Sequence, residues 1–149
     1  MTLDELLASP CSALLVGFGL TNRAVAAALV RRGHAVVVVD DRGGDEVGAA
    51  AVDLGLTLAD ASVAIDAYVS AADLVIPTPG LPEQHGVFAA ADDAGIPIAS
   101  EFDLAAVWDD RPIVAITGTN GKATVVELAV SALADAGRAA VAAGNTDIP

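Results

Sequence analysis

The chain has 149 residues, of which 54% are hydrophobic but only 3% aromatic, so any core must be built mainly from Ala, Val, Leu and Ile. Its formal net charge of −13 argues against nonspecific binding to nucleic acid or to an anionic membrane. The apolar runs are of strand length, the N-terminus is acidic and Cys11 is the single cysteine, which predicts a cytoplasmic protein without a membrane span or secretory signal.

From the N-terminus to Trp108, β-branched runs alternate with helical patterns, which predicts a Rossmann-like α/β domain with a parallel sheet. Strands are expected over 12–16, 35–39, 73–76 and 96–99, with a weaker candidate over 56–58. Helices are expected over 23–32, 47–54, 62–70, 87–94 and 101–108. A polar hinge, DDRP, follows at 109–112 and sets the predicted limits of this domain at residues 1–110.

A second unit is predicted over 111–149, with a strand over 113–117, a Gly-rich loop, a helix over 123–136 and a strand over 138–143. One βαβ unit cannot by itself form a sheet that is covered on both faces. We therefore expect it either to pack on the first domain or to be the beginning of a longer, here truncated, P-loop ATPase domain.

The second unit carries the only lysine of the chain, Lys122, in the sequence ITGTNGKAT between a predicted strand and a predicted helix. This order is typical of a cradle for nucleotide phosphates, because the amides of the turn and of the helix N-terminus face the phosphates and the lysine adds a positive charge. The alternative is a Gly-rich turn before a helix, with a surface lysine and no ligand.

The first Gly-rich turn has the sequence GFGLTN over residues 17–22 and also lies between a strand and a helix, while Asp40 ends the next strand. This context is typical of a dinucleotide site, in which an acidic residue at that place binds a ribose. Asn22 replaces the third glycine of the GxGxxG pattern, which weakens an NAD interpretation. A structural turn without a ligand is the alternative.

The third loop at the same predicted edge of the sheet is PTPGLP, residues 77–82. Pro77 and Pro79 stiffen it, Gly80 lets the backbone approach a ligand closely, and Thr78 offers a hydroxyl group. A stiff turn with no ligand explains this loop equally well.

Taken together, these segments resemble the Mur ligase family, the enzymes of peptidoglycan synthesis. In chain order they are GFGLTN, DDR, ADLVIPTPGLP, ITGTNGKAT and AAGNTDIP. Within the family, they are most similar to the ligases that add D-glutamate to UDP-N-acetylmuramoyl-L-alanine. The resemblance implies a cytoplasmic, ATP- and Mg²⁺-dependent ligase of cell-wall biogenesis, cell shape and cell division. Such a ligase activates a carboxylate as an acyl phosphate, which an amine then displaces to form an amide.

The resemblance also implies two half-sites, one for the UDP-sugar and one for ATP. The UDP-sugar would be held by Leu20 and Thr21 at the diphosphate, Asp40 and Arg42 near the uridine, Thr78, Pro79 and Gly80 around the uracil, and Asn145 from the second unit. The ATP phosphates would be held by Gly118, Thr119, Asn120, Gly121, Lys122, Ala123 and Thr124. Lys122 would be the catalytic residue, because it neutralises charge on the transferred phosphoryl group.

Two departures from the family pattern bear on activity. Ala123 stands where the family has a Ser or Thr whose hydroxyl binds Mg²⁺, so we assign no metal ligand and expect weakened Mg·ATP binding. The family's other metal ligands and its C-terminal amino-acid-binding domain would lie beyond Pro149, so this chain alone is expected to be inactive.

Two other interpretations stay open at this point. The first domain could be a non-catalytic or regulatory module that binds a nucleotide such as NAD. The chain could also come from another Mur-type or folylpolyglutamate-type ligase, which would share GTNGK but not the other segments in this form. His34 and His85 lack the spacing of metal ligands and are expected at the surface or in turns.

Overall fold

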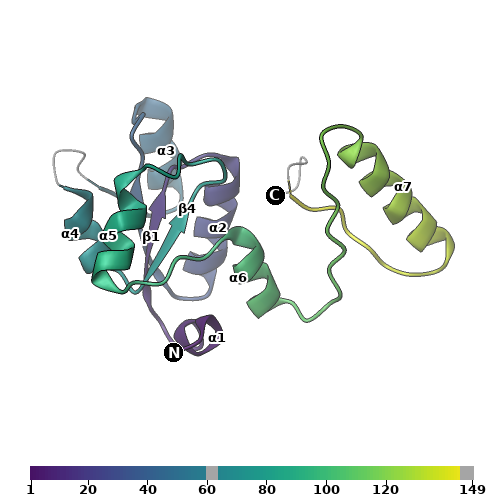
Figure 1. Ribbon diagram of the computed structural model, residues 1–149, viewed down its shortest axis with the longest axis horizontal. Coiled ribbons are helices and arrows are strands. Elements are labelled where there is room, and N and C mark those ends of the chain that lie inside the picture. Colours follow the sequence, from purple (N-terminus) through teal and green to yellow (C-terminus); the bar gives the residue numbers. More distant parts are fainter. Residues whose placement is uncertain (60–63, 145–149) are drawn as a thin grey trace. The chain divides into compact units, whose positions relative to one another are not determined.

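The structure is a computed structural model that describes residues 1–59 and 64–144. The chain divides into two compact units, Met1–Asp109 and Asp110–Pro149 (Figure 1). Every strand of the described residues lies in the first unit. Among the helices of these residues, none is long and apolar enough to cross a membrane.

The first unit is built on a four-stranded parallel sheet in the order β3-β2-β1-β4. The strands are β1 (Ser12–Val16), β2 (Ala35–Val39), β3 (Thr57–Leu58) and β4 (Leu74–Pro77). Val16 at the end of β1 pairs with Val39 of β2 and with Pro77 of β4, so three carboxyl ends meet at one edge. The chain leaves β1 for β2 on one side and later returns to β4 on the other, which makes a switch point at β1. The predicted α/β class with a parallel sheet is confirmed.

Helices cover both faces of this sheet, as Figure 1 shows. They are α1 (Leu3–Leu7), α2 (Leu20–Arg31), α3 (Asp45–Asp53), α4 (Ile65–Ser70), α5 (Gly86–Ala94) and α6 (Glu101–Trp108). Because strand side chains alternate between faces, Leu15 of β1 packs in the cluster that includes Leu29 of α2 and Leu104 of α6. Its neighbour Val16 packs in the opposite cluster, with Val87 of α5. The uninterrupted apolar run of β1 is therefore buried on both sides.

Three local features of this unit differ from what the sequence predicted. Helix α2 begins at Leu20 rather than residue 23, because Gly19 already takes the extended conformation of an N-cap. Helix α1 was not predicted, although Thr2 and Glu5 form a capping box at its start. The segment 96–99 makes only an isolated parallel bridge, between Val75 and Ile98, rather than a strand. Proline at position 97 has no N–H for a longer ladder.

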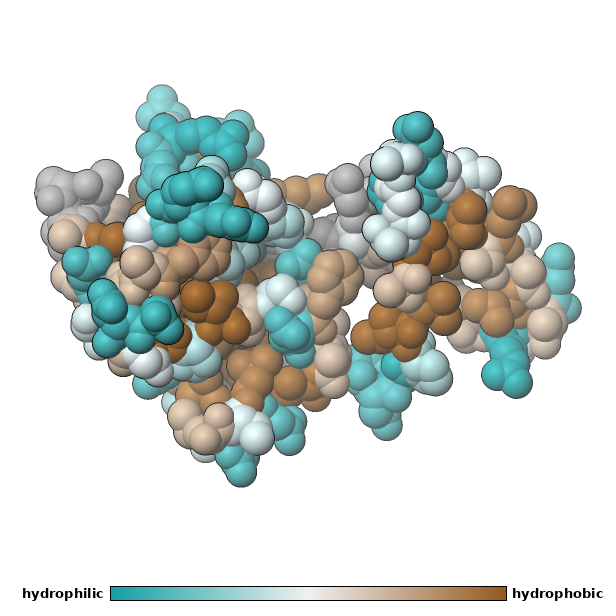
Figure 2. Space-filling model, in the orientation of Figure 1, coloured by the Kyte–Doolittle hydropathy of each residue, from teal (hydrophilic) through white to brown (hydrophobic). Residues whose placement is uncertain are grey.

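In the second unit, the residues described up to 144 contain one helix, α7 (Lys122–Asp135), which is close to the predicted span. The strands predicted over 113–117 and 138–143 are wrong, since the described residues of this unit contain no strand. A strand needs a neighbouring strand to accept its main-chain hydrogen bonds, and neither segment has one. No residue of α7 is buried, and large hydrophobic side chains of this unit, such as Val114 and Leu128, are exposed. Exposed hydrophobic residues appear brown in Figure 2.

Candidate functional site

Three loops meet at the carboxyl edge of the sheet in the first unit. They follow β1, β2 and β4, and the loop after β1 lies between the other two because β1 is flanked by β2 and β4. Ligands of open α/β sheets bind at this edge, at the switch point. The structure thus brings together the GFGLTN, DDR and PTPGLP segments that the sequence singled out.

The loops after β1 and β4 are in direct contact at Gly17 and Thr78. The Thr78 N–H donates to Val16 O over 2.7 Å. Gly17 has φ +82°, and a Cβ placed on it would lie 2.6 Å from Cγ2 of Thr78. Glycine is therefore required at position 17 both by its backbone conformation and by the threonine against it. Thr78, predicted beside the uracil, packs against the Gly-rich turn.

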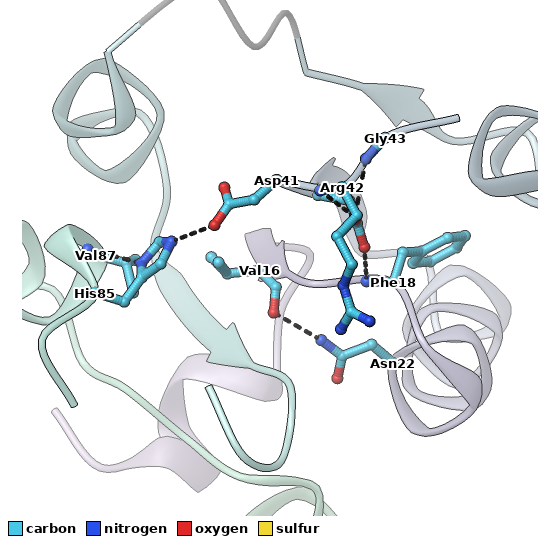
Figure 3. Close-up of polar contacts among 9 residues, drawn as sticks. Val16, Phe18, Asn22, Asp41, Arg42, Gly43, His85 and Val87 are labelled. Atoms are coloured by element: carbon cyan, nitrogen blue, oxygen red, sulfur yellow. Dashed lines mark hydrogen bonds and ion pairs between the residues drawn. The ribbon is translucent and has the colours of Figure 1, made fainter. Parts of the chain in front are cut away.

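Asp40 joins the loops after β1 and β2 through main-chain amides. Its Oδ2 accepts a hydrogen bond from Phe18 N–H over 2.7 Å. Its Oδ1 accepts from the N–H groups of Arg42 and Gly43 over 3.0 and 3.2 Å (Figure 3). The carboxylate predicted to meet a ribose or uridine therefore also holds the two loops in shape.

Asn22, at the place of the absent third glycine, is 1% exposed and binds the ends of two strands. Its Nδ2 lies 2.8 Å from Gly17 O, and 3.4 Å from both Val16 O and Ile76 O. The side chain thus links the turn after β1 to β4, and Figure 3 shows its contact with Val16. The sequence pattern treated this residue only as a defect, and its role depends on a strand far away in the chain.

The N-terminus of α2 faces this edge without a side-chain cap. Gly19 is the N-cap residue, no acidic side chain occurs in the first turn, and Leu20 is 65% exposed. Thr21 is half-buried beside it. Uncapped amides and the positive end of the helix dipole attract anions, so the geometry suits the predicted diphosphate neighbours.

The remaining predicted residues of this half-site are exposed. Arg42 lies in the loop after β2, and its guanidinium points toward the Gly-rich turn in Figure 3. Pro79 and Gly80 follow Thr78 and are also exposed. Asn145, the fourth part of the predicted substrate site, lies outside the described residues.

A contact that the sequence did not indicate crosses this edge between Asp41 and His85. The distance from His85 Nε2 to Asp41 Oδ2 is 3.0 Å (Figure 3). His85 Nδ1 also accepts from Val87 N–H over 3.2 Å and so caps α5. The position of His85 just before a predicted helix was the one sequence signal for the cap. No sequence signal indicated that His85 would contact Asp41.

His34 was expected at the surface or in a turn; its side chain is buried, at 6% exposed. Its Nδ1 accepts a hydrogen bond from Cys11 N–H over 3.3 Å, and Cys11 Sγ lies 3.2 Å from the same nitrogen. Burial, with a contribution from Arg32, lowers the pKa of His34, and burial raises the pKa of the Cys11 thiol. Both side chains are therefore part of the core of the first unit.

The predicted ATP loop of the second unit is described from Gly118 to Thr124. Lys122 is the first residue of α7, and its Nζ donates to the carbonyls of Gly118 and Thr119. Gly121 has φ +76° and precedes the helix without a side-chain cap, and the first turn holds no acidic residue. Main-chain amides at the start of α7 are therefore able to donate to an anion. The Lys122 ammonium group instead donates to carbonyls of the loop that precedes the helix.

Other features give no alternative site. Two hollows of the first unit are lined by N-terminal residues and by the segment around Pro97, and by none of the three loops at the carboxyl edge. Among the described residues, no group of three or more His, Cys, Asp or Glu side chains is placed to hold a metal ion.

Comparison with known proteins gives a consistent group of relatives, although no family model matches the chain. The chain is 38% identical over 140 residues to UDP-N-acetylmuramoylalanine–D-glutamate ligase of Desulfosudis oleivorans, covering 91% of this chain and 30% of that protein. It is 36% identical to the ligase of the same name from Syntrophus aciditrophicus, with 91% and 31% covered. The chain thus spans about a third of the length of these curated relatives.

Solved structures agree on the fold. A murein peptide ligase from Psychrobacter arcticus superposes with a TM-score of 0.58 at 22% identity, covering 92% of this chain and 30% of that one. A UDP-N-acetylmuramate:L-alanyl-gamma-D-glutamyl-meso-diaminopimelate ligase from Neisseria meningitides gives 0.58 at 20% identity, covering 87% and 41%.

Proposed function

We propose that this chain is part of a Mur-type ligase, and that its first unit binds the UDP-linked substrate of a D-glutamate-adding ligase in the cytoplasm. The observation that carries the proposal is a sequence relationship extending over 91% of the chain, which therefore includes both Gly-rich loops. In this proposal the substrate is UDP-N-acetylmuramoyl-L-alanine, and the pathway is peptidoglycan synthesis.

The geometry of the carboxyl edge supports binding of an anionic nucleotide in spite of the negative charge of the chain. Leu20 and Thr21 lie in the uncapped first turn of α2, where main-chain amides can donate to a diphosphate. Arg42 supplies a nearby cation from the loop after β2. Local donors of this kind outweigh distant charges, because charges beyond about 8–10 Å are largely screened at physiological salt.

The uridine would lie between the loops after β2 and β4. Asp40 is held by three amides, so it is an ordered acceptor. Thr78 packs against Gly17 and places Pro79 and Gly80 at the exposed rim.

The second unit would supply the ATP site. ATP provides the phosphoryl group that activates the substrate carboxylate, and the run Gly118–Thr124 would hold its phosphates with α7 amides and Lys122. For this, Lys122 Nζ must turn from the Gly118 carbonyl toward the phosphates. The loop suits phosphates, but Ala123 offers no oxygen, so it does not fit the usual place of a Mg²⁺ ligand. Catalysis would also require the parts of the relatives that this chain does not span.

Titration calorimetry tests the proposal for the substrate. The purified chain should release or absorb heat with UDP-N-acetylmuramoyl-L-alanine and with UDP, and not with NAD⁺. Binding of NAD⁺ without binding of either UDP compound would support the alternative of a dinucleotide-binding module and reject the proposal.

Ala123→Ser tests the account of the metal ligand. The introduced hydroxyl should tighten Mg²⁺-dependent ATP binding by roughly tenfold, the effect of one added charge-assisted contact. The measurement is ATP titration with Mg²⁺ and with EDTA. Ser131→Ala, which removes an exposed hydroxyl further along α7, is the control and should leave the Mg²⁺ dependence unchanged. Equal Mg²⁺ dependence in wild type and Ala123→Ser would contradict the account.

A further inference from the structure

The contact between Asp41 and His85 passes over the carboxyl end of β1. Asp41 follows β2 and His85 precedes α5, after β4, while β1 lies between those two strands. Neighbouring strands are about 4.8 Å apart, so loops on either side of β1 are separated by about 10 Å. Two side chains meeting at 3.0 Å must therefore bridge the switch point, and Figure 3 shows Val16, at the end of β1, beside this contact.

Among the described residues, His85 is held in place by more contacts than its partner Asp41. His85 Nδ1 accepts from Val87 N–H, so the ring proton is on Nε2, which donates to Asp41 Oδ2. The His85 side chain is 17% exposed and anchored by its cap on α5, whereas the Asp41 side chain is 65% exposed. If the contact opens, Asp41 is the residue that is free to move away, and His85 keeps its N–H aimed over β1.

This inference rests on the proposed function. We propose that His85 binds the UDP ligand through its Nε2–H, and that in the free protein the Asp41 carboxylate accepts the hydrogen bond from this group. An acceptor oxygen of the bound UDP replaces the Asp41 carboxylate at His85 Nε2. The negative charge of a diphosphate also repels the Asp41 carboxylate. Binding of the ligand therefore favours movement of Asp41 away from His85, and that movement in turn favours binding. The free protein thus keeps the partly buried His85 donor hydrogen-bonded until the ligand arrives.

Substitutions at the two partners should change UDP affinity in opposite directions. Asp41→Ala removes the competitor and should tighten UDP binding by roughly two- to tenfold, the effect of one hydrogen bond. His85→Asn keeps an acceptor for the Val87 amide but cannot reach over β1, so UDP binding should weaken by a similar factor. His85→Gln places an N–H near the Nε2 position and should restore much of the affinity, while the loss of the cap lowers Tm by a few degrees.

Calorimetry with UDP on the full chain, with Tm recorded for each variant, tests this proposal. Asp93→Ala, which removes an exposed charge at the other end of α5, is the matched control and should bind like wild type. Tighter binding by Asp41→Ala together with weaker binding by His85→Asn supports the proposal. Changes of the same sign in both variants overturn it and leave the proposed function standing. No UDP binding by the wild type rejects the proposed function, and this inference with it.

Discussion

Asn22 is the residue at which this chain differs most informatively from a dinucleotide-binding turn. Glycine there allows close packing of helix and strand. Here a buried carboxamide instead donates to Gly17 O, with Val16 O and Ile76 O also in reach. The cost of the larger side chain is offset by a link between β1 and β4 below the proposed site.

Replacing Asn22 by Ala should lower the free energy of unfolding by about 2 kcal/mol, because buried carbonyls lose their donor. Urea unfolding followed by circular dichroism measures this change. Asn22→Asp has the same size without an N–H donor and is the control. If Asn22→Asp were as stable as wild type, the hydrogen bonds would not be the cause.

Substituting Gly17 and Gly33 by Ala separates two contributions to the loss of unfolding free energy: backbone strain and steric contact of the added Cβ. Both have a positive φ, +82° and +84°, but a Cβ meets Thr78 only at Gly17, and nothing within 4 Å at Gly33. Gly33→Ala should therefore cost about 1 kcal/mol of unfolding free energy from backbone strain alone. Gly17→Ala should cost about 1–3 kcal/mol more, because Thr78 must shift.

Thr78→Ser provides the companion test at Gly17, since it removes the Cγ2 methyl. In the Gly17→Ala background it should recover part of the lost stability in urea unfolding. Equal destabilisation by Gly17→Ala and Gly33→Ala would show that the loops after β1 and β4 are not tightly packed.

At the scale of the element, α6 begins with a reciprocal capping box. Asp103 N–H donates to Ser100 Oγ, while Asp103 Oδ2 accepts from Ser100 N–H over 2.8 Å and from its hydroxyl over 2.7 Å. The bonds from Ser100 lower the pKa of the Asp103 carboxyl. The helix also meets α2 through Arg32, whose guanidinium lies 4.0 Å from the centroid of the Trp108 ring. The capping box thus satisfies groups at the start of α6, while the Trp108 contact ties its end to the end of α2.

The capping box predicts a pH-dependent effect of Ser100→Ala. A carboxyl whose pKa is lowered on folding stabilises the fold above its unfolded pKa of about 3.9, and this contribution is lost as the pH falls through the folded pKa. Ser100→Ala should therefore cost about 1 kcal/mol at neutral pH, and less below about pH 4. Urea unfolding between pH 3 and 7 measures the difference.

Ser70→Ala, at the exposed end of α4, is the control for this pH series. It should show a small difference from wild type that does not vary with pH. If the difference for Ser100→Ala were equally constant, ionised Asp103 would not contribute to the cap.

At the scale of the whole molecule, all strong packing of the described residues lies in the first unit. Its buried hydrophobic residues extend from Leu6 to Leu104, and no described residue after Asp109 is buried. A fragment of residues 1–109 should therefore fold with an unchanged urea midpoint. It should also bind UDP, whose proposed contacts at Leu20, Thr21 and Thr78 it retains.

Circular dichroism and UDP titration on this fragment measure both properties. A shorter fragment ending at Ala99 is the control, because it lacks α6 and the core residue Leu104, and it should unfold at a clearly lower urea concentration. Failure of the 1–109 fragment to fold would show that the second unit stabilises the first.

The sequence by itself determined the α/β class, the main elements of the first unit and its three Gly- or Pro-rich loops. These depend on local causes: apolar runs such as Ala35–Val39 favour strands, and glycines with positive φ end or interrupt elements. The family resemblance also followed from short segments, and comparison over 91% of the chain confirmed it. Strands in the second unit were predicted wrongly, because a strand depends on a partner that local pattern does not supply.

Only the tertiary structure decided which side chains meet at the carboxyl edge. Asp40 reaches Phe18 across 22 residues, His85 reaches Asp41 across 44, and Asn22 approaches Ile76 across 54. Such pairs come together because the sheet places β2, β1 and β4 side by side. The spacing of residues along the chain does not reveal this strand order. The physical reason is that strand pairing is non-local, whereas helix and turn propensities act within a few residues.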